Sequence, residues 1–441
     1  MQLKPITVVL IWLVLFLHLL TAASSKAVNT NRNIRHSDQS AVMDLAINIK
    51  ETGRPFITDA NRHPLFAWLL TPFASWSKES FAKAKIVTFI TFCAFFLLIA
   101  LFFYNRLTIT GHMWLSASLA LPAGLSLFSV TLVTDPLFTL INGLSILFFA
   151  YSFKENKYAF AGGIIAGFAF LSKYSGFMAL LVYLAFISIV LFVKFIRRKH
   201  EYKMFFTKAV LALIGFLATA SPLLLYSLKT HGSPFYNVNS KYYMWTDSWD
   251  EAKRFSGLSG DRLPTTEHKK LLAAISHDSI PGAVNYIKQH STGYMFFRML
   301  GGYKAYFNAH FGGRLKALFL LAAALLIFSA ALYRSSPDLI SSRLKSLPSL
   351  FIIFYLIIFF GSLIWYAAVS INIRYLYPGW AIACASIAYL LSSAKPYKAK
   401  VSSIVVFTMS FSALALIIFA DFHSLPPSFD LLENSAVNWL K

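Results

Sequence analysis

Residues 36–70 read HSDQSAVMDLAINIKETGRPFITDANRHPLFAWLL, and this polar stretch between two long apolar runs organises the whole chain. Apolar residues between positions 41 and 49 recur at helical spacing, and the pattern stops at residues 53–55, Gly-Arg-Pro. This pattern predicts a short helix that Ser37 or Asp38 can cap. The stretch is therefore predicted to be a partly helical loop that connects two membrane spans.

The composition is that of a membrane protein. Hydrophobic residues make up 57% of the 441 residues and charged residues only 13%, with a mean hydropathy of +0.61. These values lie far from those of soluble domains. Apolar runs fall at 5–23, 84–104, 112–133, 137–153, 158–172, 175–195, 208–228, 314–333, 348–369, 375–392 and 401–420. A helix that crosses a hydrocarbon core needs roughly 20 such residues, so we predict an all-α polytopic membrane protein with about 11 transmembrane helices.

The first run, 5–23, could be a cleaved signal peptide or a retained first helix, and its length favours a retained helix. With the N-terminus inside, 16 basic residues lie in the inner loops, whereas the short outer turns carry only Lys173 and Arg374. The positive-inside rule then places the long loops 24–80 and 229–313 outside, together with the tail 421–441. The formal net charge of +22 is thus explained by topology, and no nucleic-acid partner is expected. The expected location is a bacterial inner membrane, with the useful polar groups facing outward.

Two carboxylates in the outer loops are candidates for chemistry. Asp38 can be a helix cap, or it can face a membrane cavity as a general base. Asp44 is not its partner on one helix face, because six residues at about 100° each leave the two side chains about 120° apart. Asp135, in VTDPLF, is the second candidate acid, or a turn residue ahead of Pro136. Both alternatives remain open from the sequence.

Two cations stand at outer helix ends, where the positive-inside rule disfavours them. Lys173 precedes Tyr174 in FLSKYSG, and Arg374 precedes Tyr375 in INIRYLYPGW. Each cation could simply snorkel to the interface. A cation fixed there can instead hold a phosphate, and arginine can do so with two hydrogen bonds.

His63 precedes a predicted membrane-surface helix that starts at Pro64. A lone histidine could bind a substrate, but the chain has no HxxH or HxxxH spacing, so neither a metal nor another cofactor is expected. Cys93 and Cys384 fall inside apolar runs and are read as core residues. A divalent metal stays an open alternative.

The loop 229–313 carries the aromatic segment PFYNVNSKYYMWTDSWDE, which includes Trp245. Aromatic faces can stack on sugars or lie at the lipid headgroups, and the sequence does not separate these roles. Residues 294–307 alternate aromatic and basic side chains in the manner of an interfacial helix.

The order of these pieces resembles the membrane glycosyltransferases of the GT-C fold, particularly relatives of the dolichyl-phosphate-mannose protein mannosyltransferases and of the lipid A aminoarabinose transferase. The pieces are an outer-loop acid, GRPF, RHPLFAWLL, TDPLF, LSKYSG, PFYN and RYLYP, in that order over residues 5–395. Many relatives carry two adjacent acids in the first loop, where this chain has Asp38 and Gln39. The resemblance implies that residues 1–420 form one transmembrane glycosyltransferase domain with a GT-C-like bundle.

The resemblance also implies an inverting enzyme that moves a sugar from a polyprenyl-phosphate-linked donor to a glycan, lipid or protein acceptor on the outer face. Asp38 and Asp135 would be the catalytic acids, and Lys173 and Arg374 would bind the donor phosphate. The expected substrate-binding residues are His63, Tyr174, Tyr375 and Trp245. Alternatives are a polysaccharide ligase or polymerase with lipid-linked donors, a lipid or solute transporter, and a scaffold without catalysis.

Overall fold

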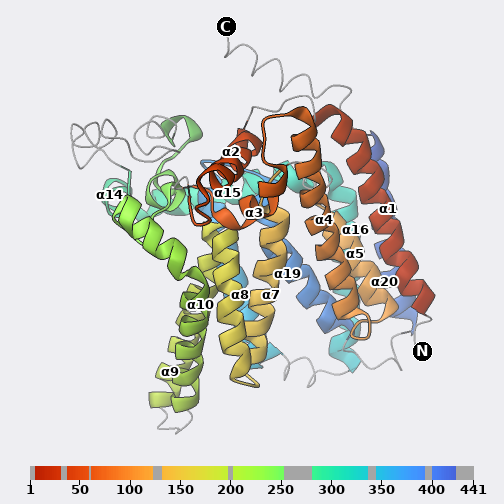
Figure 1. The fold of residues 1–441 in the computed structure, drawn as a ribbon. Helices are drawn as coiled ribbons and strands as arrows, with labels where there is room; N and C mark the ends of the chain where they lie inside the picture. Colours follow the sequence, from red (N-terminus) through yellow and green to blue (C-terminus); the bar gives the residue numbers. More distant parts are fainter. Residues whose placement is uncertain are drawn as a thin grey trace.

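The structure, a computed structural model, describes residues 5–30, 37–58, 61–122, 132–196, 202–252, 281–335, 344–392 and 400–423. Within these ranges all regular elements are helical. The longer helices form one bundle (Figure 1) and are α1 (Pro5–Thr30), α4 (Lys78–Phe103), α5 (Ile109–Ala120), α7 (Asp135–Ser152), α8 (Lys157–Ser172), α9 (Phe177–Ile196), α10 (Tyr202–His231), α16 (Leu315–Ser335), α18 (Leu347–Tyr366), α19 (Ile373–Ser392) and α20 (Lys400–His423).

The chain is an integral membrane protein, and its predicted all-α polytopic fold class is confirmed. Among the described residues, five helices are long and apolar enough to cross a membrane, or six if α16 and the helix before it count as one bent span. Each of the apolar runs found in the sequence contains a helix. The number of about 11 crossings stays a prediction.

One predicted span is interrupted. A continuous helix was expected over 112–133, but α5 ends at Ala120. Pro122 has no N–H with which to continue the ladder to the Ser118 carbonyl, and the Trp380 indole N–H donates to that carbonyl at 2.8 Å instead. The Arg314 guanidinium donates to the carbonyls of Ala120 and Leu121 at 2.7 and 3.0 Å. These side-chain donors satisfy carbonyls at the helix end that would otherwise be unpaired in an apolar environment.

Glycines allow α8 and α10 to approach closely. A Cβ atom on Gly163 would lie 2.1 Å from the Ala212 carbonyl oxygen, and one on Gly215 would lie 2.3 Å from the Phe160 carbonyl oxygen. Only a residue without a side chain fits at such backbone contacts, as in other membrane helix pairs. This tight pair supports the outer turn that follows α8.

Both long loops place their short helices at one end of the bundle, opposite the N-terminal end of α1 (Figure 1). These helices are α2 (Ser37–Thr52), α3 (Pro64–Leu70), η1 (Thr71–Phe73), α11 (Val238–Lys241), η3 (Tyr243–Trp245), α14 (Ala283–Gln289) and α15 (Thr292–Phe311). The predicted stop of α2 is confirmed, since Gly53 adopts a φ of 65°, which favours glycine. The residues predicted to form an interfacial helix, 294–307, lie in α15, which meets α16 at a bend of 104°. The interfacial location of α15 stays a prediction. We refer to this end of the bundle as the outer end, after the side of the membrane predicted from the sequence.

Candidate functional site

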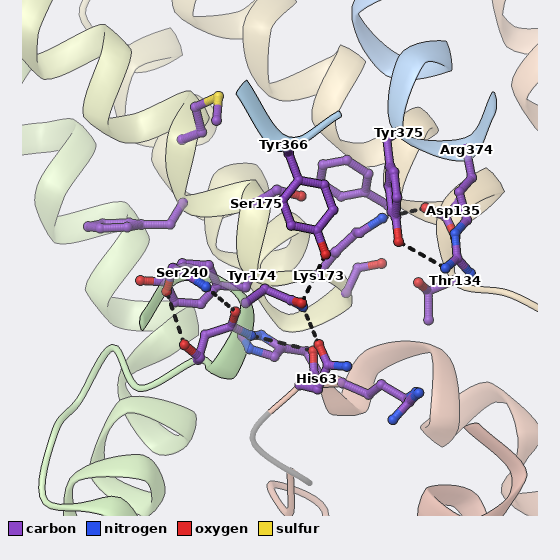
Figure 2. Close-up of a pocket in the computed structure, with 18 of the residues that line it drawn as sticks. His63, Thr134, Asp135, Lys173, Tyr174, Ser175, Ser240, Tyr366, Arg374 and Tyr375 are labelled. Atoms are coloured by element: carbon purple, nitrogen blue, oxygen red, sulfur yellow. Dashed lines mark hydrogen bonds and ion pairs between the residues drawn. The ribbon is translucent and has the colours of Figure 1, made fainter. Parts of the chain in front are cut away.

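A cavity of about 1880 Å³ opens among the helices of the outer end (Figure 2). It is larger than the roughly 300–1,000 Å³ of most small-molecule sites, so it has room for more than one substrate. Six of the residues expected from the sequence line it: His63, Asp135, Lys173, Tyr174, Arg374 and Tyr375. The cavity therefore brings together side chains from four separate parts of the chain.

Asp135 and Lys173 form an ion pair in the cavity wall. The Lys173 ammonium lies 2.5 Å from Asp135 Oδ1, with the carboxylate side chain 3% exposed and the lysine side chain 25% exposed. Asp135 is the first residue of α7, where the helix dipole favours a negative charge. Lys173 follows α8 in an extended conformation, and a Cβ on Gly176 would lie 2.2 Å from the Ala169 carbonyl carbon. Gly176 thus allows the sharp turn that aims Lys173 at α7.

The Tyr375 ring lies beside both cations. The Lys173 ammonium is 4.7 Å and the Arg374 guanidinium 4.9 Å from the centroid of this ring, within the range of cation–π attraction. Arg374 also donates to the Tyr375 hydroxyl at 2.9 Å. The two cations predicted to bind phosphate therefore lie around one aromatic ring (Figure 2).

His63 lies in the cavity wall and connects two parts of the fold. Its ring is 4% exposed, and its Nδ1 forms a hydrogen bond with the Phe170 carbonyl of α8. A carbonyl only accepts, so Nδ1 carries the hydrogen. Burial lowers the pKa of His63 to about 4, although the bond to Phe170 acts in the opposite direction. The imidazole is neutral near pH 7, so it can offer hydrogen bonds but no charge to a ligand.

Asp38 is the second residue of α2, but its side chain lies outside the described part of the structure. Its neighbour Gln39 accepts a hydrogen bond from the backbone N–H of Leu132 at 3.0 Å. Leu132 lies three residues before Asp135, so the first turn of α2 is attached to the segment that leads into α7. Asp44 of the same helix lines the cavity.

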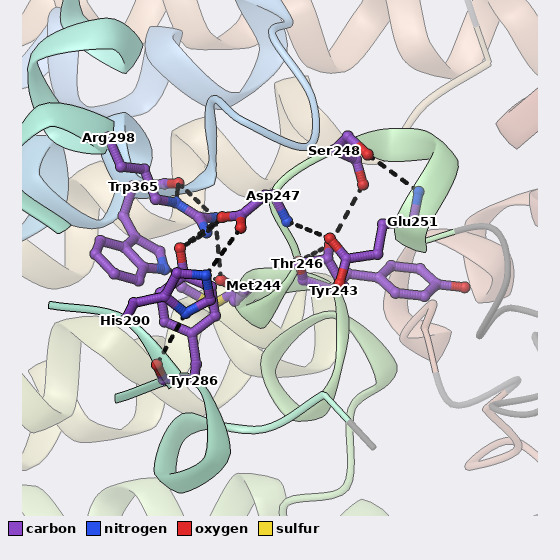
Figure 3. Close-up of polar contacts among 10 residues, drawn as sticks. All are labelled: Tyr243, Met244, Thr246, Asp247, Ser248, Glu251, Tyr286, His290, Arg298 and Trp365. Carbon is purple, nitrogen blue, oxygen red and sulfur yellow. Dashed lines mark hydrogen bonds and ion pairs between the residues drawn. The ribbon is translucent and has the colours of Figure 1, made fainter. Parts of the chain in front are cut away.

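Tyr174 lies edge-on to His63, with ring centroids 6.0 Å apart. Trp245, also expected to bind substrate, is not among the described cavity-lining residues. Its ring packs against Tyr286 and Trp365 at centroid distances of 6.1 and 5.9 Å. It therefore belongs to a neighbouring aromatic cluster around Arg298. Figure 3 shows Arg298 together with Tyr286 and Trp365.

Several lining groups were not identified from the sequence. The Tyr366 hydroxyl donates to Asn239 Oδ1 at 3.2 Å, and the Asn239 amide donates to Asn61 Oδ1. Tyr366 stands at the outer end of a hydrophobic run, which is the one feature of the sequence that could have suggested a role. Asparagines in a polar loop give no comparable signal.

An apolar groove extends the cavity between α9 and α18. Its walls are formed by Phe177, Met178, Leu181, Val182 and Ala185 on α9 and by Phe354, Ile358, Phe359 and Leu363 on α18. Leu181 is 48% and Ile358 41% exposed, so the groove is open at its side. From Phe177 to Ala185 it follows α9 for about 12 Å, at roughly 1.5 Å per residue.

Among the described residues, no group of three or more His, Cys, Asp or Glu side chains could hold a metal ion. The charged groups that line the cavity are the Asp135–Lys173 ion pair, the carboxylates Asp44 and Glu51, and the arginines Arg62 and Arg374. The other polar groups are neutral hydroxyl, amide and imidazole groups. This set can bind an anion and can hydrogen bond to hydroxyl groups.

No family model matches the chain, and no curated protein matches it. Among solved structures, the chain is similar to ArnT from Cupriavidus metallidurans, which was determined bound to undecaprenyl phosphate. The TM-score is 0.47 and the sequence identity 11%, over 91% of this chain and 62% of ArnT. The chain thus spans less than two thirds of the length of that protein.

Proposed function

We propose that this protein is an inverting glycosyltransferase that moves a sugar from a polyprenyl-phosphate-linked donor to an acceptor at the outer face of the membrane. The observation that carries the proposal is the continuity of one cavity, in which two cations lie at the outer end of an apolar groove. A ligand that fits both parts must have an anionic head and a long apolar tail.

The cations give the donor phosphate a place to bind. Lys173 is already paired with Asp135, so Arg374 is assigned the main contact and Lys173 adds a second positive charge nearby. Arginine matches the oxygens of a phosphate with a planar pair of donors. The same charges stabilise the leaving phosphate as its negative charge develops, in a site partly shielded from water.

The groove gives the polyprenyl tail a path into the membrane. Its side opening at Leu181 and Ile358 lets a lipid enter by diffusing within the bilayer. A donor that arrives in this way needs no nucleotide-binding loop.

The reaction needs a base, and Asp38 is assigned this role. Its carboxylate takes the proton from an acceptor hydroxyl while that oxygen attacks the anomeric carbon of the donor sugar. The bond from the anomeric carbon to the phosphate oxygen breaks, and the phosphate keeps the electron pair. Attack from the opposite side inverts the configuration. A positioned base contributes typically ~10²–10⁴-fold, and holding the two substrates together supplies more.

A transporter is the main alternative from another class. Secondary transporters place their sites near the bilayer midplane, on broken helices of repeated halves. The cations of this cavity instead come from outer helix ends, at Lys173 after α8 and at Arg374 in the first turn of α19, which supports the transferase. A ligase or polymerase that uses lipid-linked donors would share the donor site and differ in its acceptor.

Donor binding tests the proposal. Purified protein in nanodiscs is titrated with undecaprenyl phosphate, and Arg374→Ala should weaken binding by about one to two orders of magnitude, because a charge-assisted contact contributes about 1.5–3 kcal/mol. Arg374→Lys should recover only part of the affinity. The control is Lys304→Ala, which removes an exposed cation on α15 that is not among the described lining residues. Unchanged affinity in Arg374→Ala would show that this arginine is only an interfacial anchor.

The groove is tested with a matched pair of substitutions on α9. Ala185→Trp fills the groove, whereas Ile189→Trp, one turn further on, places a tryptophan at a position where the native side chain is 51% exposed. The first variant should lose affinity for undecaprenyl phosphate but keep that for a short-chain isoprenyl phosphate. The second should resemble the unmodified protein with both lipids. Equal effects of the two variants would contradict the tail path.

A further inference from the structure

Beyond the cations and the groove, the cavity has a third part that neither a phosphate nor a lipid tail would use. We call it the rim and define it by Asp44, Asn48 and Glu51 of α2 together with Asn239, Tyr243 and Trp249 of the outer loop. The α2 members follow one another at spacings of four and three residues, which places them on one helix face. All three are exposed.

Trp249 offers the rim an accessible aromatic face. The side chain is 45% exposed and still lines the cavity. Its ring packs edge-on against the buried Tyr243, with centroids 5.9 Å apart and an interplanar angle of 82°. An exposed tryptophan ring in a cavity can stack on another flat or ring-shaped ligand group.

A partly buried network, drawn in Figure 3, holds the segment from Asp247 to Glu251, which includes Trp249. The Arg298 side chain, 4% exposed, donates to Asp247 Oδ1 at 2.8 Å and to the Trp365 and Met244 carbonyls at 3.3 Å. The Asp247 backbone N–H donates to Glu251 at 2.8 Å. Asp247 and Glu251 flank Trp249 in the chain, so the network fixes the backbone on both sides of this ring.

The chemistry of the rim differs from that of the phosphate site. Carboxylates and amides accept and donate hydrogen bonds to hydroxyl groups, and an aromatic ring covers the apolar face of a sugar. Asp44 and Glu51 place two negative charges at the rim, and Arg62, which lines the cavity nearby, offsets one of them. The remaining negative charge disfavours an anionic ligand. The rim thus fits a neutral, hydroxyl-rich ring.

We infer that the rim is the acceptor subsite and that it takes the end of a neutral glycan, which stacks on Trp249 and bonds to the polar face of α2. This inference rests on the proposed glycosyltransferase function and specifies its acceptor class. A phosphorylated lipid headgroup would meet Asp44 and Glu51, and a peptide would leave the ring stacking unused.

The test uses the full chain in nanodiscs on an array of printed neutral and acidic oligosaccharides, with lipid A vesicles and hydroxyl-bearing peptides as further probes. Neutral oligosaccharides should bind best. Trp249→Ala should weaken their binding at least about fivefold, as expected for the loss of an aromatic contact, whereas Trp249→Phe should keep most of it. Trp76→Ala is the control, because Trp76 is 37% exposed but is not among the described residues of the cavity wall.

Preferred binding of lipid A or of peptides, or neutral-glycan binding that Trp249→Ala leaves unchanged, would overturn the inference. Absence of any glycan binding would overturn it as well. Undecaprenyl phosphate binding is measured on the same samples. Its absence counts against the proposed function, whereas its presence without neutral-glycan binding counts against the acceptor subsite alone.

Discussion

The Lys173 ammonium lies 2.5 Å from Asp135 Oδ1, and the pair joins the end of α8 to the start of α7. Both residues were singled out in the sequence for separate roles, as a phosphate ligand and as an acid. Because Asp135 is engaged with the lysine, we assign it to positioning Lys173 and assign proton transfer to Asp38.

Removing the charge of one member of this ion pair should destabilise the fold. Asp135→Asn or Lys173→Met leaves one charge without its partner in a mostly buried place, which typically costs about 3–5 kcal/mol. The double variant should recover much of the lost thermal stability, because it removes both charges. Thermal denaturation of the three purified variants in detergent measures this effect. Additive losses in the double variant would show that the two residues act independently.

Removing the assigned base should abolish transfer without unfolding the protein. Asp38→Asn keeps the size of the side chain in the first turn of α2, so we expect a normal melting temperature and a rate reduced by at least ~10²-fold. Glu79→Gln serves as control, because it removes an exposed carboxylate that pairs with Lys83 and is not among the described residues of the cavity wall. Sugar transfer from a polyprenyl-phosphate donor is followed with both variants. Near-normal turnover of Asp38→Asn would direct attention to Asp44 or Asp135.

His63 should make the fold sensitive to mild acid. Burial lowers its pKa from the ordinary value of 6.5 to about 4 in the folded protein. Between these two pH values the unfolded chain therefore binds more protons than the folded chain. The contribution of His63 to the free energy of unfolding is therefore fully present above pH 6.5. It is lost as the pH falls toward 4, by about 3 kcal/mol in all. His63→Asn can still donate to the Phe170 carbonyl and should show a smaller decrease in melting temperature between pH 7.5 and 5. An identical pH dependence in both proteins would contradict the assignment.

The orientation is tested by labelling single cysteines in a background without Cys93 and Cys384. An impermeant thiol reagent should label Ala60→Cys in intact cells and Lys199→Cys only after permeabilisation, as the positive-inside rule predicts. Labelling of both from the same side would overturn the orientation and the outward-facing site with it.

The sequence predicted the parts of the site that break a local rule. Lys173 and Arg374 attracted attention because cations are rare in short outer turns, and Asp135 because it lies between two apolar runs. The structure brings these three residues to one cavity. Helix α2 was predicted with its stop at Gly53, since apolar spacing and a glycine stop are local signals.

Features that depend on distant packing could not be predicted. The groove residues Leu181 and Ile358 look like any lipid-facing positions in their helices, and only the packing of α9 against α18 makes them a groove. The early end of α5 depends on donors from Arg314 and Trp380, which are about 200 or more residues away. Trp245 was selected for its aromatic setting, but its ring packs in the aromatic cluster around Arg298. No pattern in the sequence indicates this packing.

The most direct test of the central claim maps where a polyprenyl phosphate binds. An undecaprenyl phosphate analogue with a photoreactive diazirine in its first isoprene units is crosslinked to the protein in nanodiscs, and the adducts are located by mass spectrometry. We predict adducts at groove residues such as Leu181 and Ile358, which unlabelled undecaprenyl phosphate displaces and Arg374→Ala weakens. Adducts spread over exposed positions such as Ile189 and Phe192, without competition, would contradict the account.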